Sequence, residues 1–413
     1  MATLFLDLTP LRASRGFRVV FVARTVSLFG IGLAQVALPV QVFGLTGSSA
    51  QVGLVSLAMA IALLCGTLLG GVLADRGDRR TLIVRARTLA IAAGVVLLVN
   101  AAVPSPSLGA LYLADVVNGF SGGLSSTVLM AVSPTLVGRA HLPAAGALMT
   151  LTTQVGMIVS PSVGGLLIAG PGLTATYGIA VAAAVITAVT LRALPSLPPA
   201  SGSAEQRHPV HAMAEGLRYV VRTPVVLGLM VIDLFPMLLA MPNALFPAVA
   251  AERFGGDPAV TGLFFTAPAI GAMIAALTSG WTGSLRRPGW VLFGAIALWG
   301  LGVLGFGLSS VVWLAVVLLA VSGFGDAVSE ILRRALIQSA TPDELQGRVS
   351  SLWLSQATVG SAAGNTVAGF AGRFLGTGVT LVAGGALCVA GALATTLSTR
   401  GLRAARTDAT LES

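Results

Sequence analysis

Residues 49–80 read SAQVGLVSLAMAIALLCGTLLGGVLADRGDRR, an apolar segment that ends in a cluster of charges. Residues 49–74 contain no charged side chain, and about 20 apolar residues are enough for a helix to cross the hydrocarbon core of a membrane. Five of the six positions from Asp75 to Arg80 are then charged, although charged residues make up only 9% of the chain. The stretch predicts a membrane-spanning helix that ends at a charged surface.

The rest of the chain repeats this pattern and predicts an all-α membrane protein. Hydrophobic residues make up 55% of the 413 positions, and the mean hydropathy is +0.91. Soluble domains, by contrast, carry about a quarter charged residues. We expect twelve transmembrane helices, at 18–43, 49–74, 81–103, 107–131, 143–169, 173–195, 224–249, 258–283, 288–308, 311–332, 349–372 and 376–399.

The basic residues indicate how the chain is oriented. If both termini are cytoplasmic, every arginine except Arg24, Arg253 and Arg373 falls on the cytoplasmic side, Arg87 and Arg333 included. This satisfies the positive-inside rule. It also explains the basic composition without a nucleic-acid partner. We therefore expect a multi-pass protein of a bacterial inner membrane that contacts lipids and acts as a monomer.

The sequence does not indicate an enzyme. It contains no lysine, so neither a Walker A phosphate loop nor a lysine Schiff base can form. The GFSGG stretch at 119–123 fits the G-x-S-x-G pattern of hydrolases, but it lies inside a predicted span. We interpret it as helix packing, and we expect no catalytic residues, metal or cofactor.

A polar linker divides the predicted helices into two sets of six. We expect bundles at 1–195 and 224–413, joined by a cytoplasmic linker at 196–223 in which the segment AMAEGLRYVVR is helical. The segment at 148–165 aligns with 352–369, matching Gly156 to Gly360 and Gly165 to Gly369. Such parallel repeats are typical of one large class of transporters.

Two motifs add a family resemblance. GVLADRGDRR at 71–80 resembles the signature between helices 2 and 3 of the major facilitator superfamily, and GMIVSPSVGG at 156–165 resembles the helix 5 motif of its proton-coupled antiporters, with Ser160 in place of a glycine. Segments 23–54, 70–80, 134–148 and 341–353 are similar to the family of enterobactin exporters. The resemblance implies proton-driven antiport of a small molecule by alternating access. The expected cargo is a siderophore, with macrolide or multidrug efflux as the alternative.

The charged corner is a candidate conformational gate, formed by Gly71, Asp75, Arg76, Arg79 and Arg80. Asp75 would lie at the C-terminal end of its own helix, where the helix dipole disfavours an anion by about 0.3–1 kcal/mol. A better partner is the N-terminus of another helix, near Gly347. The resemblance likewise implies that this aspartate latches the two halves together. Asp78, Arg79 and Arg80 can add ion pairs between helices, whereas the alternative is that the arginines only orient the protein.

The helix 5 motif is a candidate packing element, formed by Gly156, Pro161, Gly164 and Gly165. Small residues let helix backbones approach closely. Proline removes a backbone donor and bends the helix.

Ionisable residues inside the spans are candidates for the proton and substrate cavity, since each is costly to place in a membrane. The candidates are Arg24, Asp115, Asn118, Asp233, Asp326 and Glu330. Asp115 and Asp233 lie roughly 12–14 Å along their helices and are the favoured proton carriers. Arg24 can anchor an anionic substrate or neutralise Asp233, while Glu330 is expected to pair with Arg334, four residues later. Four carboxylates against one arginine would favour neutral or cationic cargo over a catecholate.

Overall fold

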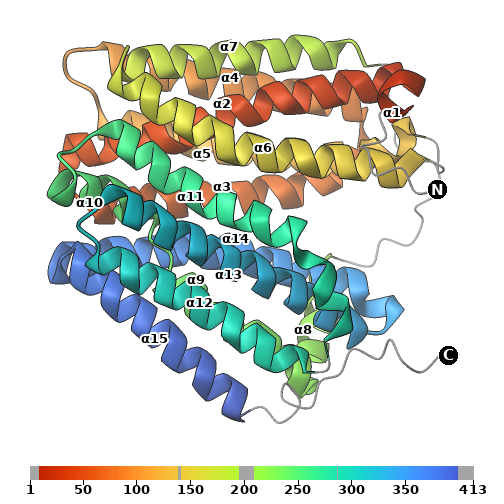
Figure 1. Cartoon of the computed structure of the whole chain (residues 1–413). Helices are drawn as coiled ribbons and strands as arrows, with labels where there is room; N and C mark the ends of the chain where they lie inside the picture. Colours follow the sequence, from red (N-terminus) through yellow and green to blue (C-terminus); the bar gives the residue numbers. More distant parts are fainter. Residues whose placement is uncertain (1–8, 138–140, 195–208, 286, 399–413) are drawn as a thin grey trace. The chain divides into compact units, whose positions relative to one another are not determined.

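The computed structural model describes residues 9–137, 141–194, 209–285 and 287–398, whose regular structure is helical throughout (Figure 1). The α-helices are α1 (Thr9–Ala13), α2 (Arg15–Thr46), α3 (Ser49–Arg76), α4 (Arg79–Ala102), α5 (Leu108–Leu136), α6 (Leu142–Ala169), α7 (Leu173–Arg192), α8 (Pro209–Arg222), α9 (Pro224–Leu239), α10 (Phe246–Arg253), α11 (Pro258–Leu277), α12 (Pro288–Leu308), α13 (Val312–Ser339), α14 (Asp343–Leu375) and α15 (Thr377–Ser398). Two 3-10 helices, η2 (Asn243–Leu245) and η3 (Ser279–Ser284), lie between them.

Each predicted span coincides with a helix, and the all-α membrane fold is confirmed. Among the described residues, ten helices are long and apolar enough to cross a membrane, counting α9, η2 and α10 together as Pro224–Arg253. The other two, α5 and α14, have 29 and 33 residues but carry more polar side chains, such as Asp115 and Gln356. With them the described structure is consistent with twelve spans.

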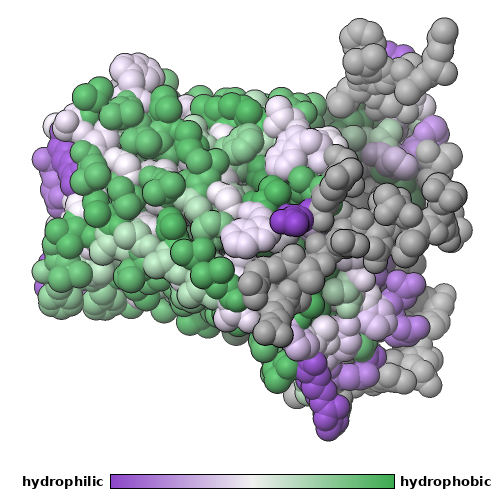
Figure 2. All heavy atoms as spheres, turned by 60° about the horizontal axis from the view of Figure 1, so that its bottom comes forward, coloured by the Kyte–Doolittle hydropathy of each residue, from purple (hydrophilic) through white to green (hydrophobic). Residues whose placement is uncertain are grey.

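The outward surface of these helices suits a lipid environment. Figure 2 shows apolar side chains over most of the helical surface in view, with hydrophilic residues gathered towards the helix ends. Large apolar residues are exposed along many helices; Leu166, Val189 and Leu308 are 64%, 58% and 68% exposed. Water would disfavour so much exposed apolar surface, whereas hydrocarbon does not.

The chain forms two compact units. The first contains residues 1–47, 55–202 and 257–266, and the second contains 48–54, 203–256 and 267–413. The N-terminal residues of α3 therefore group with the second unit, and those of α11 with the first. The helix expected within the linker is α8, and its Glu215 forms a 2.7 Å salt bridge with Arg348 of α14 in the same unit.

Repeat-related glycines make matching contacts in the two units. In the first unit, a Cβ on Gly165 of α6 would lie 2.7 Å from the carbonyl oxygen of Pro258 on α11. In the second unit, Gly369 of α14 abuts the Ser49 backbone of α3 in the same way. The alignment of Gly165 with Gly369 thus corresponds to equivalent packing positions.

The seventh span is broken, which the sequence analysis did not anticipate. Helix α9 ends at Leu239, and the chain passes through η2 before α10 begins at Phe246. Two side chains satisfy backbone groups at the break: Asn365 Oδ1 accepts a hydrogen bond from the Ala244 amide at 3.1 Å, and Trp299 Nε1 donates to the Ala240 carbonyl at 3.1 Å. Backbone groups freed within a membrane need such internal partners.

Asn365→Ala is expected to lower the free energy of unfolding by about 1–3 kcal/mol, because the buried Ala244 amide loses its acceptor. Thermal unfolding of the purified protein in detergent measures the effect. Ser351→Ala, at an exposed position on the same helix α14, is the matched control. Equal melting temperatures for the two variants would contradict this role for Asn365.

Candidate functional site

Two arginines lie in the interior of the first unit, between its helices. Arg24 of α2 donates from Nη2 to Thr153 Oγ1 at 3.2 Å, and Arg87 of α4 donates from Nη1 to Ser27 Oγ at 2.9 Å. Arg24 lies nine residues from the start of its helix and Arg87 eight residues from the start of its own. Each is therefore about 12–14 Å along its helix at 1.5 Å per residue. Arg87, expected at the cytoplasmic surface, belongs instead to the interior of the bundle.

Asp115 is the acidic group within the spans of the first unit. It lies on α5 and is only 7% exposed. In the described part of the chain no arginine forms a salt bridge with it, and it makes no hydrogen bond. The hydroxyl of Tyr177 on α7 is also buried and has no hydrogen-bond partner among the described residues. The carboxyl group is thus enclosed and, among the described residues, is not neutralised by a fixed cation.

The second unit contains a buried ion pair. Arg333 of α13 donates from Nη1 to Asp233 Oδ1 of α9, and the two residues are 2% and 0% exposed. The remaining Asp233 oxygen and the Arg333 Nε are buried and have no hydrogen-bond partner in the part of the chain that the structure describes. Asp326 lies seven residues before Arg333 on the same helix α13. Arg333, assigned from the sequence to the cytoplasmic surface, is instead the neutralising partner of Asp233, so Arg24 is not needed in that role.

The expected ion pair between Glu330 and Arg334 is not formed. Glu330 is exposed, and the Arg334 guanidinium lies over the Trp353 ring at 5.2 Å from its centroid. Residues four apart on one helix face can form an ion pair. Here the Arg334 guanidinium instead makes a cation–π contact with Trp353 of α14.

These placements correct the expected charge balance. The helices of the two units enclose three arginines, Arg24, Arg87 and Arg333, rather than one. With Asp233 neutralised by Arg333, the argument that an acidic cavity disfavours an anionic cargo no longer holds. Asn118 is half-buried on α5, one helical turn from Asp115.

The charged corner joins α3 to α4, and only part of it is described. Asp75 and Arg76 lie outside the residues whose side chains are described, so the latch stays a prediction. Asp78 is the N-cap of α4, accepting from the Arg80 amide at 3.0 Å. The side chains of Arg79 and Arg80 donate to the carbonyls of Ala74, at 3.5 Å, and Arg192, at 2.5 Å.

These carbonyls belong to the last turns of α3 and α7, which have no intrahelical donors. Among the residues whose side chains are described, Arg79 and Arg80 thus bond to helix ends and do not form the expected ion pairs. Gly71 is half-buried, and a Cβ there would meet no atom within 4 Å. Close packing therefore does not explain this glycine.

The small residues of the helix 5 motif, which lies on α6, make close contacts within the first unit. A Cβ on Gly156 would lie 3.3 Å from Leu28 Cβ, and one on Gly164 would lie 3.4 Å from Leu33 Cα. Pro161 and Ser160 are buried, and Ser160 packs against Gly32 of α2. The serine that replaces the motif glycine is thus accommodated by a glycine on the neighbouring helix.

Gly165→Val is expected to abolish transport or prevent folding, because its side chain would overlap the α11 backbone at Pro258 and Gly262, where even a Cβ would approach within 2.7–2.9 Å. Gly146→Val on the same helix is the matched control, since a Cβ there meets nothing within 4 Å. The readouts are membrane-inserted protein by immunoblot and export per inserted molecule. A Gly165→Val variant with normal yield and export would contradict the packing role.

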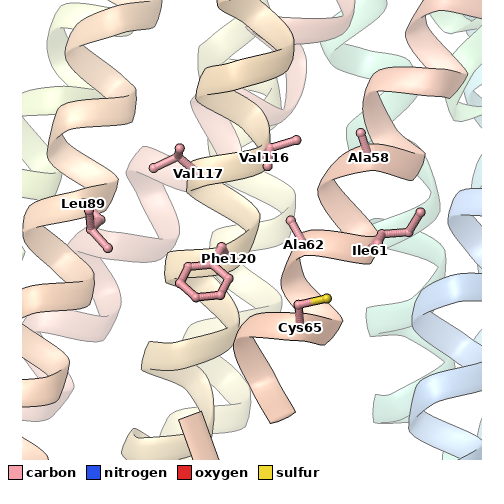
Figure 3. A pocket seen from close by; sticks show the side chains of 8 residues that line it. All are labelled: Ala58, Ile61, Ala62, Cys65, Leu89, Val116, Val117 and Phe120. Carbon is pink, nitrogen blue, oxygen red and sulfur yellow. The ribbon is translucent and has the colours of Figure 1, made fainter. Parts of the chain in front are cut away.

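An apolar hollow of about 720 Å³ lies between α3, α4 and α5 (Figure 3). It is lined by Ala58, Ile61, Ala62, Cys65, Leu89, Val116, Val117 and Phe120. Behind this lining, Gly119 and Gly123 of the GFSGG stretch abut the α3 backbone at Met59 and Leu63, as the packing interpretation predicted. None of the candidate ionisable residues lines the hollow, so the charged chemistry lies elsewhere.

Comparison with known proteins gives consistent results. Residues 6–410 match the sequence model of the family described as "Transmembrane secretion effector". The chain is 37% identical over 374 residues to the Enterobactin exporter EntS of Shigella boydii serotype 18, covering 90% of this chain and 88% of that protein. The exporter of the same name from Escherichia coli (strain UTI89 / UPEC) gives the same values.

Solved structures share the fold at low sequence identity. The nucleoside transporter NupG superposes with a TM-score of 0.72 at 16% identity, covering 93% of this chain and 98% of that one. A POT family transporter in complex with 5-aminolevulinic acid superposes with a TM-score of 0.75 at 13% identity, covering 94% and 97%.

Proposed function

This chain belongs to the transmembrane secretion effector family of the major facilitator superfamily, and from that premise we propose that it exports a siderophore of the enterobactin class in exchange for protons. The observation that carries the proposal is the 37% identity to enterobactin exporters over 90% of the chain. The protein is a multi-pass membrane transporter rather than an enzyme. We place it in a bacterial inner membrane as a monomer with both termini cytoplasmic, as the arginine distribution favours.

The mechanism follows from the charges inside the two units. Asp115 is a buried carboxyl group without a fixed cation, so it can accept and release a proton as its access to water changes. In the second unit, Asp233 is engaged by Arg333, and Asp326 and Glu330 lie on the same helix as that arginine. A proton bound in this group of carboxyls would weaken the ion pair. We assign the proton-carrying role first to Asp115, with Asp233 and Asp326 as responding groups.

Alternating access needs a gate, which we assign to the corner at Gly71, Asp75, Arg76, Arg79 and Arg80. Asp75→Asn is expected to abolish export while leaving membrane insertion intact, because the neutral side chain no longer holds a helix N-terminus. Asp78→Asn is the matched control: asparagine is an equally good N-cap for α4. Full export by Asp75→Asn would remove the latch from the mechanism.

Deletion of the gene in its native host tests the function directly. We expect the deletion strain to retain siderophore inside the cell and to release less of it, with unchanged sensitivity to macrolides and dyes. Complementation with the intact gene restores release. Hypersensitivity to macrolides with normal siderophore release would instead identify a drug exporter of the same architecture.

A further inference from the structure

Arg24 and Arg87 bring two positive charges close together in the first unit. Arg87 donates to Ser27, and Ser27 lies three residues after Arg24, one turn along the same helix α2. Residues three apart share a helix face, so the Ser27 hydroxyl that Arg87 contacts lies on the same side of α2 as Arg24. Both salt bridges found in the described part of the chain lie in the second unit, and neither involves these arginines.

The two guanidinium groups have donors to spare. Arg24 has a hydrogen bond to the neutral Thr153 hydroxyl and Arg87 to the neutral Ser27 hydroxyl. The Nε atoms of both arginines are buried and have no acceptor among the described residues. An arginine carries five N–H donors in a fixed fork, and a buried donor without an acceptor costs free energy. The two side chains therefore have buried N–H donors available to an oxygen anion.

We propose that Arg24 and Arg87 together bind an acidic oxygen group of the cargo, either the adjacent oxygens of a catecholate or a carboxylate. Two neighbouring oxygens match the guanidinium fork, which binds such groups through parallel hydrogen bonds. The positive charges also favour the ionised form of a phenol. The proposal rests on the proposed function only for the identity of the cargo, since the buried N–H donors of the two arginines are the same whichever molecule is exported.

Binding of 2,3-dihydroxybenzoate, a small catechol carboxylate, tests the site in the purified protein. We expect Arg24→Gln and Arg87→Gln each to weaken binding about 10- to 100-fold, as loss of one charge-assisted contact does. Arg85→Gln is the matched control, because Arg85 is exposed two residues away on α4. Benzamide, which has no acidic oxygen, should bind weakly to all variants.

Lysine variants at the same two positions provide a second test if a glutamine variant does not fold. Arg24→Lys and Arg87→Lys keep the charge but lose the fork, and we expect weaker binding by about 3- to 10-fold. Wild-type affinity in the glutamine variants, or in the lysine variants where these replace them, would overturn the proposal. So would equal affinity for dihydroxybenzoate and benzamide.

Export assays distinguish failure of the arginine site from failure of the proposed siderophore export. If Arg87→Gln exports siderophore as fast as wild type, the arginine site is wrong while siderophore export stands. If the wild type exports no siderophore but binds dihydroxybenzoate through both arginines, the site stands and the cargo is a different acidic molecule.

Discussion

Asp233→Ala is expected to destabilise the protein by about 3–5 kcal/mol, because it leaves the buried Arg333 charge without its partner. Arg333 is 2% exposed, so water cannot replace the lost carboxylate. The ion pair also links α13 to α9, so export should fall together with stability. Thermal unfolding in detergent and the yield of inserted protein measure the loss.

A double variant distinguishes the effect of removing the whole ion pair from the effect of leaving one charge unpaired. Asp233→Leu with Arg333→Met removes both charges, and we expect it to recover much of the stability lost in either single variant, since no unpaired charge remains buried. Glu344→Gln, which removes an exposed carboxylate in the same unit, is the matched control. If Asp233→Ala were as stable as Glu344→Gln, the ion pair would not support the fold.

Asp115→Asn is expected to abolish gradient-driven export while the protein becomes no less stable. The carboxylate is 7% exposed and makes no salt bridge in the described part of the chain. Replacing it with a neutral side chain of similar shape removes the cost of burying an ionised carboxylate, so we expect no loss of stability. The asparagine cannot bind and release a proton, so the coupling is lost. A residue that matters only for folding would not show this opposite response.

The readouts are the melting temperature and proton-driven export in membrane vesicles prepared from the same cells. Asp115→Glu keeps a titratable group and should retain part of the activity. Export by Asp115→Asn at the wild-type rate, or a fall in its melting temperature comparable to that of Asp233→Ala, would count against the proton-carrying role.

The sequence predicts the helices well because their signal is local. An apolar run of membrane length forms a helix wherever it occurs, since a backbone in lipid must satisfy its own hydrogen bonds. The positions of Asp115 and Asp233 within their spans follow from counting along the helix. The packing role of the GFSGG stretch also follows from its place inside a span.

Partners that are distant in the sequence could not be predicted in this way. Arg333 and Asp233 are 100 positions apart, and the local rule favoured a pair between Glu330 and Arg334 that does not form. Arg87 lies far enough from the end of its helix to be internal, but a rule that counts basic residues near loops assigns it to the surface. Pro236 and Pro242 are a signal in the sequence that the seventh span is broken. The hydrogen bond from the Ala244 amide to Asn365, which supports the break, depends on tertiary packing and could not be predicted.

Proton-coupled export by purified protein tests the central proposal most directly. The protein is reconstituted in liposomes that contain a pH-sensitive dye, a pH gradient is imposed, and siderophore movement is followed together with the internal pH. We predict that adding siderophore accelerates dissipation of the gradient, that siderophore moves against the proton flow, and that Asp115→Asn abolishes both. Siderophore movement that is independent of the gradient, or unchanged in Asp115→Asn, would contradict the account.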